Sequence, residues 1–309
     1  MTWIPALHRL LAATCAPRRA WACRPRRGGS TAGRLLAMVC LVAGLAAACG
    51  SPSTEESPAG DGVEWVTNVA AGAAPDEGTT PRVNVAAASD LRGALEELRP
   101  ALEGACQTAV TVTYGSSGQL SQQIAAGAPF ALFLSADRQY PEQLAAKGRV
   151  APGGLALYGR GRLALVVRDG LPVPGSPGAL VDGPYRSIAI ANPQHAPYGR
   201  AARQALERSG TLAAVETRLV IAENVRQALD YVETGNADAG LVALALIPPG
   251  ARQAVHLVDA ALHEPIEQAG AVIAGSGAER TARCLLQYLL DAPGQAVLQR
   301  YGFEPAGTP

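Results

Sequence analysis

From Arg82 onward, short apolar runs alternate with segments in which apolar residues recur at helical spacing. The run at 83–87 favours a buried strand, and a helix is predicted over 91–103. The apolar face of this helix consists of Leu91, Ala94, Leu95, Leu98 and Leu102. Further strands are predicted at 110–114 and 131–134, and further helices at 120–126 and 141–147. This β-α-β-α-β-α order predicts a mostly parallel sheet covered by helices.

A second series of the same kind follows. Its predicted strands are 163–167, 187–190, 219–221 and 240–242, its helices are 199–209 and 225–234, and a Pro- and Gly-rich run at 173–184 is typical of a loop. Two helices, 279–290 and 294–301, are predicted at the end. Two such series with a helical return indicate an α/β fold of two lobes, with mixed, mostly parallel sheets and a cleft between the lobes. Open sheets bind ligands at the carboxyl ends of their strands, so the turns that follow the strands are the place to seek a site.

The first 49 residues have the composition of an export signal. They contain seven Arg and no acidic residue, and the uncharged apolar stretch 35–48 has the length of a signal-peptide core rather than of a membrane span. Residues 45–50, Leu-Ala-Ala-Ala-Cys-Gly, resemble a bacterial lipobox and predict a lipid anchor on Cys49. The alternative is an ordinary signal peptide with a chance Cys. The Arg-rich start is either an extended signal or lies upstream of the true start codon.

Charge and composition exclude one class of partner. Residues 50–81 are rich in Ser, Pro, Gly, Glu and Ala without apolar periodicity, which predicts a flexible tether. The chain has 26 basic and 26 acidic residues, but seven of the basic ones lie in the first 49 residues, so the remainder is acidic. Nucleic-acid binding requires a basic surface, and it is therefore not expected. Any bound anion is expected to be held by local hydrogen-bond donors.

Four predicted strand-to-helix turns present donors suited to an anion. They lie at 86–90, 114–118, 192–199 and 223–225, and two of them also carry Ser hydroxyls. Each turn places backbone N–H groups without intrahelical partners at a helix start, where the helix dipole favours negative charge. Taken alone, Ser89, Ser117 and Asn224 are each better explained as ordinary helix caps, and only their combination on two lobes favours a site.

Signals for catalysis are weak. The histidines outside the leader lack metal-ligand spacing, and the sequence contains neither H-E-x-x-H nor C-x-x-C. The run Gly-Ser-Ser-Gly at 115–118 differs from a G-x-S-x-G nucleophile elbow, and Asp137 is favoured as a helix cap over a catalytic carboxylate. No enzyme, no resident metal and no cofactor is expected. A secreted serine hydrolase using Ser89 or Ser117 is the alternative from another class.

Seven segments in a fixed order share a family pattern. They are Val-Ala-Ala-Ala-Ser at 85–89, Gly-Ser-Ser-Gly-Gln-Leu at 115–120, Gln-Ile-Ala-Ala-Gly-Ala-Pro at 123–129, Leu-Phe-Leu-Ser-Ala-Asp at 132–137, Ala-Asn-Pro-Gln-His-Ala-Pro-Tyr-Gly at 191–199, Glu-Asn-Val-Arg-Gln-Ala-Leu at 223–229 and Arg-Tyr-Gly-Phe at 300–303. In these segments the sequence resembles the molybdate-binding periplasmic proteins of ABC importers. The resemblance runs from about Val83 to Phe303 and covers nearly all of the predicted folded part.

The resemblance implies a type II periplasmic binding protein whose two lobes close over a ligand. Residues 82–158 and 264–305 would form the first lobe, and residues 159–263 the second. Cys106 and Cys284 would then share the first lobe and, in an oxidising compartment, form either a disulfide or two separate buried thiols.

Carried over by position, the site consists of four residues. Ser89 and Ser117 would donate from their hydroxyl and N–H groups, and Tyr198 and Val225 from N–H groups at helix starts. The N–H of Asp90 is expected beside Ser89, with its carboxylate directed away from the anion. Many members have a Tyr where Ala243 stands here, so one phenol hydrogen bond is missing, and the phenol of Tyr198 is a candidate replacement.

The resemblance also implies a function. The protein would capture molybdate, and tungstate of nearly the same size, for import by an ABC permease with its ATPase. Molybdenum would be bound only as the oxyanion, without a direct protein ligand. The protein is expected to be a monomer in the periplasm or on the outer face of the cell membrane, tethered through Cys49. A receptor for sulfate or phosphate is the alternative within the same class.

Overall fold

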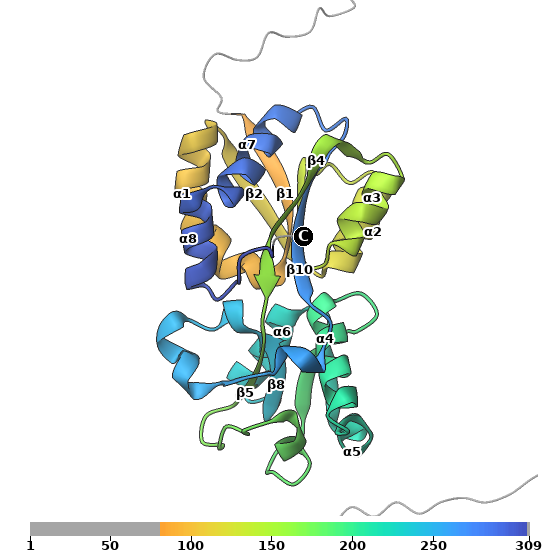
Figure 1. The fold of residues 1–309 in the computed structure, drawn as a ribbon, viewed down its shortest axis with the longest axis vertical. Coiled ribbons are helices and arrows are strands. Elements are labelled where there is room, and N and C mark those ends of the chain that lie inside the picture. Colours follow the sequence, from red (N-terminus) through yellow and green to blue (C-terminus); the bar gives the residue numbers. More distant parts are fainter. Residues whose placement is uncertain (1–80, 308–309) are drawn as a thin grey trace, which may run out of the picture. The chain divides into compact units, whose positions relative to one another are not determined.

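The computed structural model describes residues 81–307, which contain two five-stranded sheets (Figure 1). The predicted export signal, the lipobox with Cys49 and nearly all of the predicted tether lie outside these residues. No helix in the described part is long and apolar enough to cross a membrane. The two predicted lobes each contain one sheet, and the α/β class is confirmed.

The first sheet has the strand order β2-β1-β3-β10-β4. Its strands are β1 (Arg82–Ala88), β2 (Ala109–Gly115), β3 (Leu132–Ser135), β4 (Val150–Gly161) and β10 (Ile266–Ile273). β1 is parallel to β2 and β3, whereas β10 is antiparallel to β3 and β4. The predicted strands β1, β2 and β3 are present, and β4 and β10 were not predicted.

Helices cover both faces of this sheet. β2 and β3 lie on opposite sides of β1, so the connection from β1 to β2 and the connection from β2 to β3 run in opposite directions across the sheet. Because both crossovers are right-handed, their helices lie on opposite faces. The helices are α1 (Arg92–Cys106), α2 (Ser117–Ala125), α3 (Gln139–Ala146), α7 (Glu279–Leu290) and α8 (Ala292–Arg300), and the one-turn 3-10 helix η1 (Ser89–Leu91) precedes α1. Figure 1 shows α1, α7 and α8 together on one side and α2 and α3 on the other. On β1, Val83 and Val85 pack in the core beneath α1, α7 and α8, and Ala86 packs in the core beneath α2 and α3. This alternation is typical of a strand that is buried on both faces.

The second sheet repeats this arrangement with the order β7-β6-β8-β5-β9. Its strands are β5 (Leu163–Val167), β6 (Ile188–Ala191), β7 (Leu219–Ala222), β8 (Ala239–Ala243) and β9 (His256–Leu257), and its helices are α4 (Pro197–Arg208), α5 (Leu212–Val215) and α6 (Val225–Glu233). β6 is parallel to β7 and β8, and β5 is antiparallel to β8 and β9. The connections include the 3-10 helices η2 (Pro177–Leu180), η3 (Glu216–Arg218), η4 (Leu244–Leu246), η5 (Pro249–Ala254) and η6 (Ala260–Leu262). Both sheets are mixed, as predicted, but each has as many antiparallel as parallel pairs.

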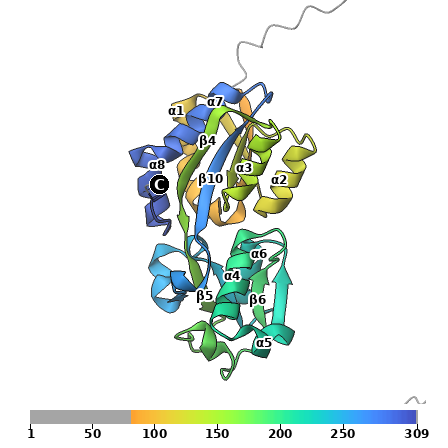
Figure 2. The ribbon, with the colours of Figure 1, turned by 45° about the vertical axis from the view of Figure 1, so that its right-hand side comes forward.

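Two segments connect the lobes. β4 stays in the first sheet through Gly161, beyond the predicted boundary after residue 158, and only Arg162 separates it from β5 in the second sheet. The chain returns through η6 into β10, whose first residue, Ile266, pairs with Gly161. Figure 2 shows β4 and β10 side by side along this junction. We call the paired ends of β4 and β10 the hinge.

A disulfide joins the helices that flank the first sheet. Cys106 at the end of α1 is bonded to Cys284 in α7, with 5.8 Å between their Cα atoms. Of the two alternatives for these cysteines, the structure has the bridge. It links residues 178 positions apart and so fastens the C-terminal return to the beginning of the fold.

Candidate anion-binding site

Ser89, Ser117, Tyr198 and Val225 line one narrow pocket between the two lobes, although they come from four separate turns. The turns lie at the carboxyl ends of the parallel strands β1, β2, β6 and β7, where an open α/β sheet binds its ligand. Each of the four residues is at most 4% exposed. The remaining lining residues are Ala88, Asp90, Gly115, Ser116, Ala136, Ala196, Pro197 and Asn224. None of the lining residues is Lys, Arg or His.

The second lobe offers backbone N–H groups at two helix starts. The side chain of Asn224 accepts hydrogen bonds from the N–H groups of Arg226 and Gln227, at 3.1 and 3.2 Å, and so caps α6 while leaving the N–H of Val225 unused. At α4, the capping residue contributes no side-chain hydrogen bond and Pro197 has no N–H. Tyr198 therefore carries the first amide donor of α4. First-turn amides have no acceptor within their own helix, so both donors suit an external anion.

The first lobe adds hydroxyl donors. The Ser117 hydroxyl oxygen accepts a 3.0 Å hydrogen bond from the N–H of Ala136, so its own proton remains free to be donated. Ser116 lines the same pocket, but its hydroxyl donates to the carbonyl of His195 at 2.6 Å and is thereby engaged. The structure therefore distinguishes two adjacent serines: the hydroxyl proton of Ser117 is free to be donated to a ligand, whereas that of Ser116 is already donated to His195.

A tight contact closes the lobes beside these donors. The N–H of Gly118 donates to the carbonyl of His195 at 2.9 Å, across the lobes. A Cβ at Gly118 would lie 2.7 Å from this oxygen and 2.8 Å from the hydroxyl of Tyr140. Real Cβ atoms are essentially never found that close to another heavy atom. Glycine is therefore needed at position 118, because a side chain there would prevent the lobes from approaching each other this closely.

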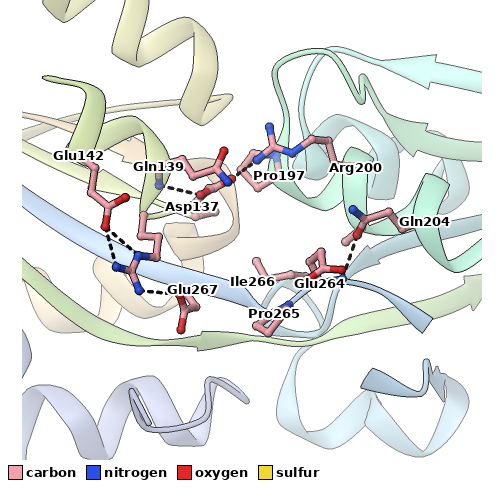
Figure 3. Close-up of a pocket in the computed structure, with 13 residues that line it drawn as sticks. Asp137, Gln139, Glu142, Pro197, Arg200, Gln204, Glu264, Pro265, Ile266 and Glu267 are labelled. Atoms are coloured by element: carbon pink, nitrogen blue, oxygen red, sulfur yellow. Dashed lines mark hydrogen bonds and ion pairs between the residues drawn. The ribbon is translucent and has the colours of Figure 1, made fainter. Parts of the chain in front are cut away.

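Side-chain contacts between the lobes surround the pocket. Arg200 of α4 donates to the hydroxyl of Tyr140 at 2.9 Å. It also forms an ion pair with Asp137, at a neighbouring pocket that is drawn in Figure 3. Gln119 of α2 is hydrogen-bonded to Glu223, at the turn before α6. Asp137 also accepts a 2.8 Å bond from the N–H of Gln139, which agrees with its expected role as a cap of α3. The structure therefore has its two lobes closed.

Asp90, next to Ser89, carries a completely buried carboxyl group. Its Oδ2 accepts a 2.8 Å hydrogen bond from Nε2 of Gln268 on β10, so the carboxyl is directed to the hinge and away from the pocket, as expected. Burial raises its pKa to about 6, although hydrogen bonding with Gln268 and Tyr198 and the N–H groups of Asp90 and Leu91 act in the opposite direction. That the N–H of Asp90 donates beside Ser89 stays a prediction.

The phenol of Tyr198 also turns to the hinge. Its hydroxyl is buried against Gly161 and has no hydrogen bond of regular geometry within the described residues. Burial, together with the negative charge of Asp90, raises the pKa of this phenol well above its usual range. Ala243 ends β8, is fully buried and does not line the pocket. The hydroxyl of Tyr198 thus lies next to the hinge, and that its phenol replaces the missing Tyr stays a prediction.

Among the described residues, no group of three or more His, Cys, Asp and Glu side chains is placed to hold a metal ion.

Comparison with known proteins identifies the family. Residues 83–304, which make up more than two thirds of the chain, match the family of bacterial extracellular solute-binding proteins. The chain belongs to this family. It is 34% identical over 195 residues to the molybdate-binding protein ModA of Rhodobacter capsulatus, covering 63% of this chain and 77% of the relative. It is 31% identical over 224 residues to ModA of Azotobacter vinelandii, covering 72% and 89%.

The solved structures agree. The periplasmic molybdate-binding protein of Azotobacter vinelandii superposes with a TM-score of 0.69 at 32% identity, over 73% of this chain and all of the other. The two-lobed fold of a periplasmic binding protein is thereby confirmed. This solute-binding protein belongs to a family of extracytoplasmic receptors and not of enzymes, so the hydrolase alternative is set aside. That Ser89, Ser117, Tyr198 and Val225 hold the solute stays a prediction.

Proposed function

We propose that this solute-binding protein captures molybdate outside the cytoplasm and delivers it to an ABC permease with its ATPase. The observation that carries the proposal is the convergence of donors from both lobes on a pocket without a cationic side chain. The donors are the N–H groups of Tyr198 and Val225 and the hydroxyl and N–H groups of Ser89 and Ser117. Relatives of this chain that share its fold are named for molybdate binding.

The chemistry of the pocket suits a tetrahedral dianion that carries no proton. Such an ion offers only acceptor oxygens, and a site made of donors satisfies all of them. The amide oxygen of Asn224, the one uncharged side-chain carbonyl in the lining, is occupied by two backbone N–H groups. Hydrogen bonds to a charged group contribute about 1.5–3 kcal/mol each, so several of them offset the cost of desolvating the ion. A protonated phosphate brings a donor that this lining does not serve.

Size then separates the remaining dianions. Sulfate has the same charge and shape as molybdate but is smaller, and tungstate is nearly the same size. We therefore propose that tungstate is bound as well and that sulfate is rejected because the donors on opposite walls cannot all reach it.

Entry and release require the lobes to separate. The free volume of the closed pocket is about 10 Å³, comparable to that of a single water molecule. An oxyanion therefore enters only when the lobes move apart about the hinge, and closure then brings the donors of both walls onto it. The closed arrangement is the form that we propose the permease recognises.

The setting of the protein completes the proposal. We propose that Cys49 is lipidated, that residues 50–81 tether the domain to the outer face of the membrane, and that the domain acts as a monomer. Mass spectrometry of the mature N-terminus tests the first point: a diacylated Cys49 is expected, and an unmodified end at another residue would contradict it.

Calorimetry tests the function. Molybdate, tungstate, sulfate and phosphate are titrated separately into the purified protein, and tight binding of only the first two is expected. Ser117→Ala should weaken molybdate binding by roughly 10- to 100-fold, since it removes one charge-assisted hydrogen bond. Ser121→Ala is the matched control, because Ser121 is buried on the same helix but does not line the pocket. Preferential binding of sulfate or phosphate would replace the proposal with the alternative oxyanion receptor.

A further inference from the structure

A buried acid lies beside the anion pocket, and among residues 81–307 no basic side chain forms an ion pair with it. Asp90 is 0% exposed, and only one of its carboxyl oxygens, Oδ2, has a regular hydrogen bond, from Gln268. The other oxygen, Oδ1, is buried and has no regular hydrogen-bond partner in the described residues. Asp90 directly follows Ser89, and both residues line the pocket. The charge of this carboxylate therefore lies close to the place proposed for a doubly negative ion.

The neighbours of this carboxyl from the hinge and from α4 that are described next are uncharged. The charged residues at the hinge pair elsewhere: Arg160 with Glu267, and Arg162 with Glu304. β10 contributes Gln268, whose Oε1 accepts a 3.0 Å hydrogen bond from the hydroxyl of Tyr158 on β4. The Tyr158 hydroxyl also lies 3.2 Å from the carbonyl oxygen of Ser135. α4 contributes the hydroxyl of Tyr198, which, like Oδ1 of Asp90, is buried without a regular partner.

The elements packed against η1 supply no counter-ion either. On α1, the guanidinium of Arg92 lies over the ring of Tyr114, 4.6 Å from its centroid. On α6, the guanidinium of Arg226 is paired with Asp230 and Glu233. η4 consists of Leu and Ala alone. Within the part of the chain that the structure describes, a negative charge on Asp90 is therefore stabilised by hydrogen bonds and not by an ion pair.

We propose that Asp90 takes up one proton from solvent when the pocket binds a doubly negative oxyanion, and that it thereby sets the charge of the ion the pocket accepts. The proposal rests on the proposed function. Oδ2 is already engaged with Gln268, so the proton goes to Oδ1, the oxygen without a regular partner; the hydroxyl of Tyr198 also lies beside the carboxyl group. That hydroxyl donates toward the ionised carboxylate and accepts from the protonated carboxyl, so both forms of Asp90 can be served by one neighbour.

The reason is like-charge repulsion in a closed, poorly solvated space. A carboxylate and a dianion held side by side disfavour the ionised form of the carboxyl and raise its pKa. Burial, partly offset by hydrogen bonds, already brings the pKa of Asp90 to about 6 before any ion binds. Binding raises this value further, so above about pH 6 the ion and one proton bind together.

Proton uptake fixes the pH dependence of binding. Above the pKa of the unoccupied protein, affinity falls by up to tenfold for each unit of pH, because one proton must be taken from an ever more dilute supply. Between about pH 6 and pH 8 the affinity for molybdate should therefore fall by roughly 50- to 100-fold. A pocket that gained its affinity from donors alone would show no such slope.

Isothermal titration calorimetry counts the proton directly. Molybdate is titrated into the protein at about pH 7.5 in two buffers of different ionisation enthalpy, and the difference in observed enthalpy gives the protons taken up. The wild-type protein should take up close to one proton per ion. Asp90→Asn, which keeps the shape and removes the charge, should take up none and should bind with an affinity that is independent of pH. The exposed Asp169→Asn is the matched control and should behave as the wild type.

A second variant covers the case in which Asp90→Asn does not fold. Tyr198→Phe removes the hydroxyl that stabilises the ionised carboxyl, so the pH at which affinity begins to fall should move upward. Binding of molybdate without proton uptake by the wild-type protein, or undiminished uptake by Asp90→Asn, overturns the inference and leaves the proposed function intact. Absence of any molybdate binding overturns the proposed function itself and this inference with it.

Discussion

Arg200, on α4 of the second lobe, donates a 2.9 Å hydrogen bond to the hydroxyl of Tyr140, on α3 of the first. The same guanidinium pairs with Asp137 and lies 5.5 Å from the centroid of the Tyr140 ring. All of these partners belong to the opposite lobe, so the contacts exist only while the lobes are closed. They stabilise the closed arrangement without touching the pocket.

Replacing Arg200 should therefore weaken binding by changing the closing equilibrium. Arg200→Ala is expected to lower the affinity for molybdate by about 5- to 30-fold, corresponding to about 1–2 kcal/mol for partly buried charge-assisted contacts. The loss should appear in the dissociation rate, measured by stopped-flow fluorescence, because closure follows encounter. Arg203→Ala is the control, since Arg203 lies on the same helix and pairs with Glu207 in its own lobe. An unchanged dissociation rate in Arg200→Ala would show that these contacts do not hold the lobes closed.

Gly118 should tolerate no side chain if the closed arrangement is the binding form. A methyl group there would meet the carbonyl of His195 across the lobes and the hydroxyl of Tyr140 in its own lobe. Gly118→Ala is expected to lower the affinity at least about tenfold while leaving the thermal stability of the unliganded protein nearly unchanged. Gly104→Ala is the control: Gly104 lies in α1 with no atom within 4 Å of a new Cβ, and the change should stabilise the protein by about 0.5–1 kcal/mol. Small-angle scattering with and without molybdate shows whether Gly118→Ala still closes.

Sequence patterns predicted the elements whose burial follows a simple period. β1, with Val83 and Val85 on one face and Ala86 on the other, and α1, with its leucine face, were recognised because both bury a regular pattern. β4 and β10 were not predicted, because their positions depend on each other. β10 includes the buried polar Gln268 together with Gly270, whose missing side chain makes room for Leu286. Neither residue type follows from local strand propensity, because both are determined by contacts with residues far away in the sequence.

The candidate site, too, could be predicted only in part from the sequence. The positions of Ser89, Ser117, Tyr198 and Val225 at strand ends follow from the strand-to-helix pattern and the resemblance, and the structure brings all four together. The direction of the Tyr198 phenol did not follow, because it depends on the space that Gly161 leaves at the hinge, and Gly161 precedes Tyr198 by 37 positions in the sequence. The direction of a side chain at a lobe boundary is determined by tertiary contacts, and the local sequence does not indicate it.

Asp90 should make the unliganded protein less stable as pH rises. Its pKa is about 6 when folded, above the value of roughly 4 expected for an unfolded Asp, so the folded state binds the proton more tightly. The stability contributed by this proton is complete below about pH 4 and is lost as pH rises through about 6. Asp90→Asn removes the titration and should therefore raise the free energy of unfolding by about 2–3 kcal/mol at pH 7, relative to its effect near pH 4. Urea unfolding at both pH values measures this; a gain that does not depend on pH would contradict a buried ionised Asp90.

The disulfide gives the last prediction, because it closes a loop of 178 residues in the unfolded chain. A cross-link over so long a loop restricts the unfolded ensemble, and its removal is expected to cost about 2–5 kcal/mol. The double variant Cys106→Ser with Cys284→Ser should show this loss in urea unfolding, and reduction of the wild-type protein should reproduce it. Affinity for molybdate at room temperature should hardly change, since both cysteines lie on α1 and α7, away from the lining of the pocket. A variant that unfolds at the wild-type urea concentration would show that the bridge contributes nothing to the stability of the first lobe.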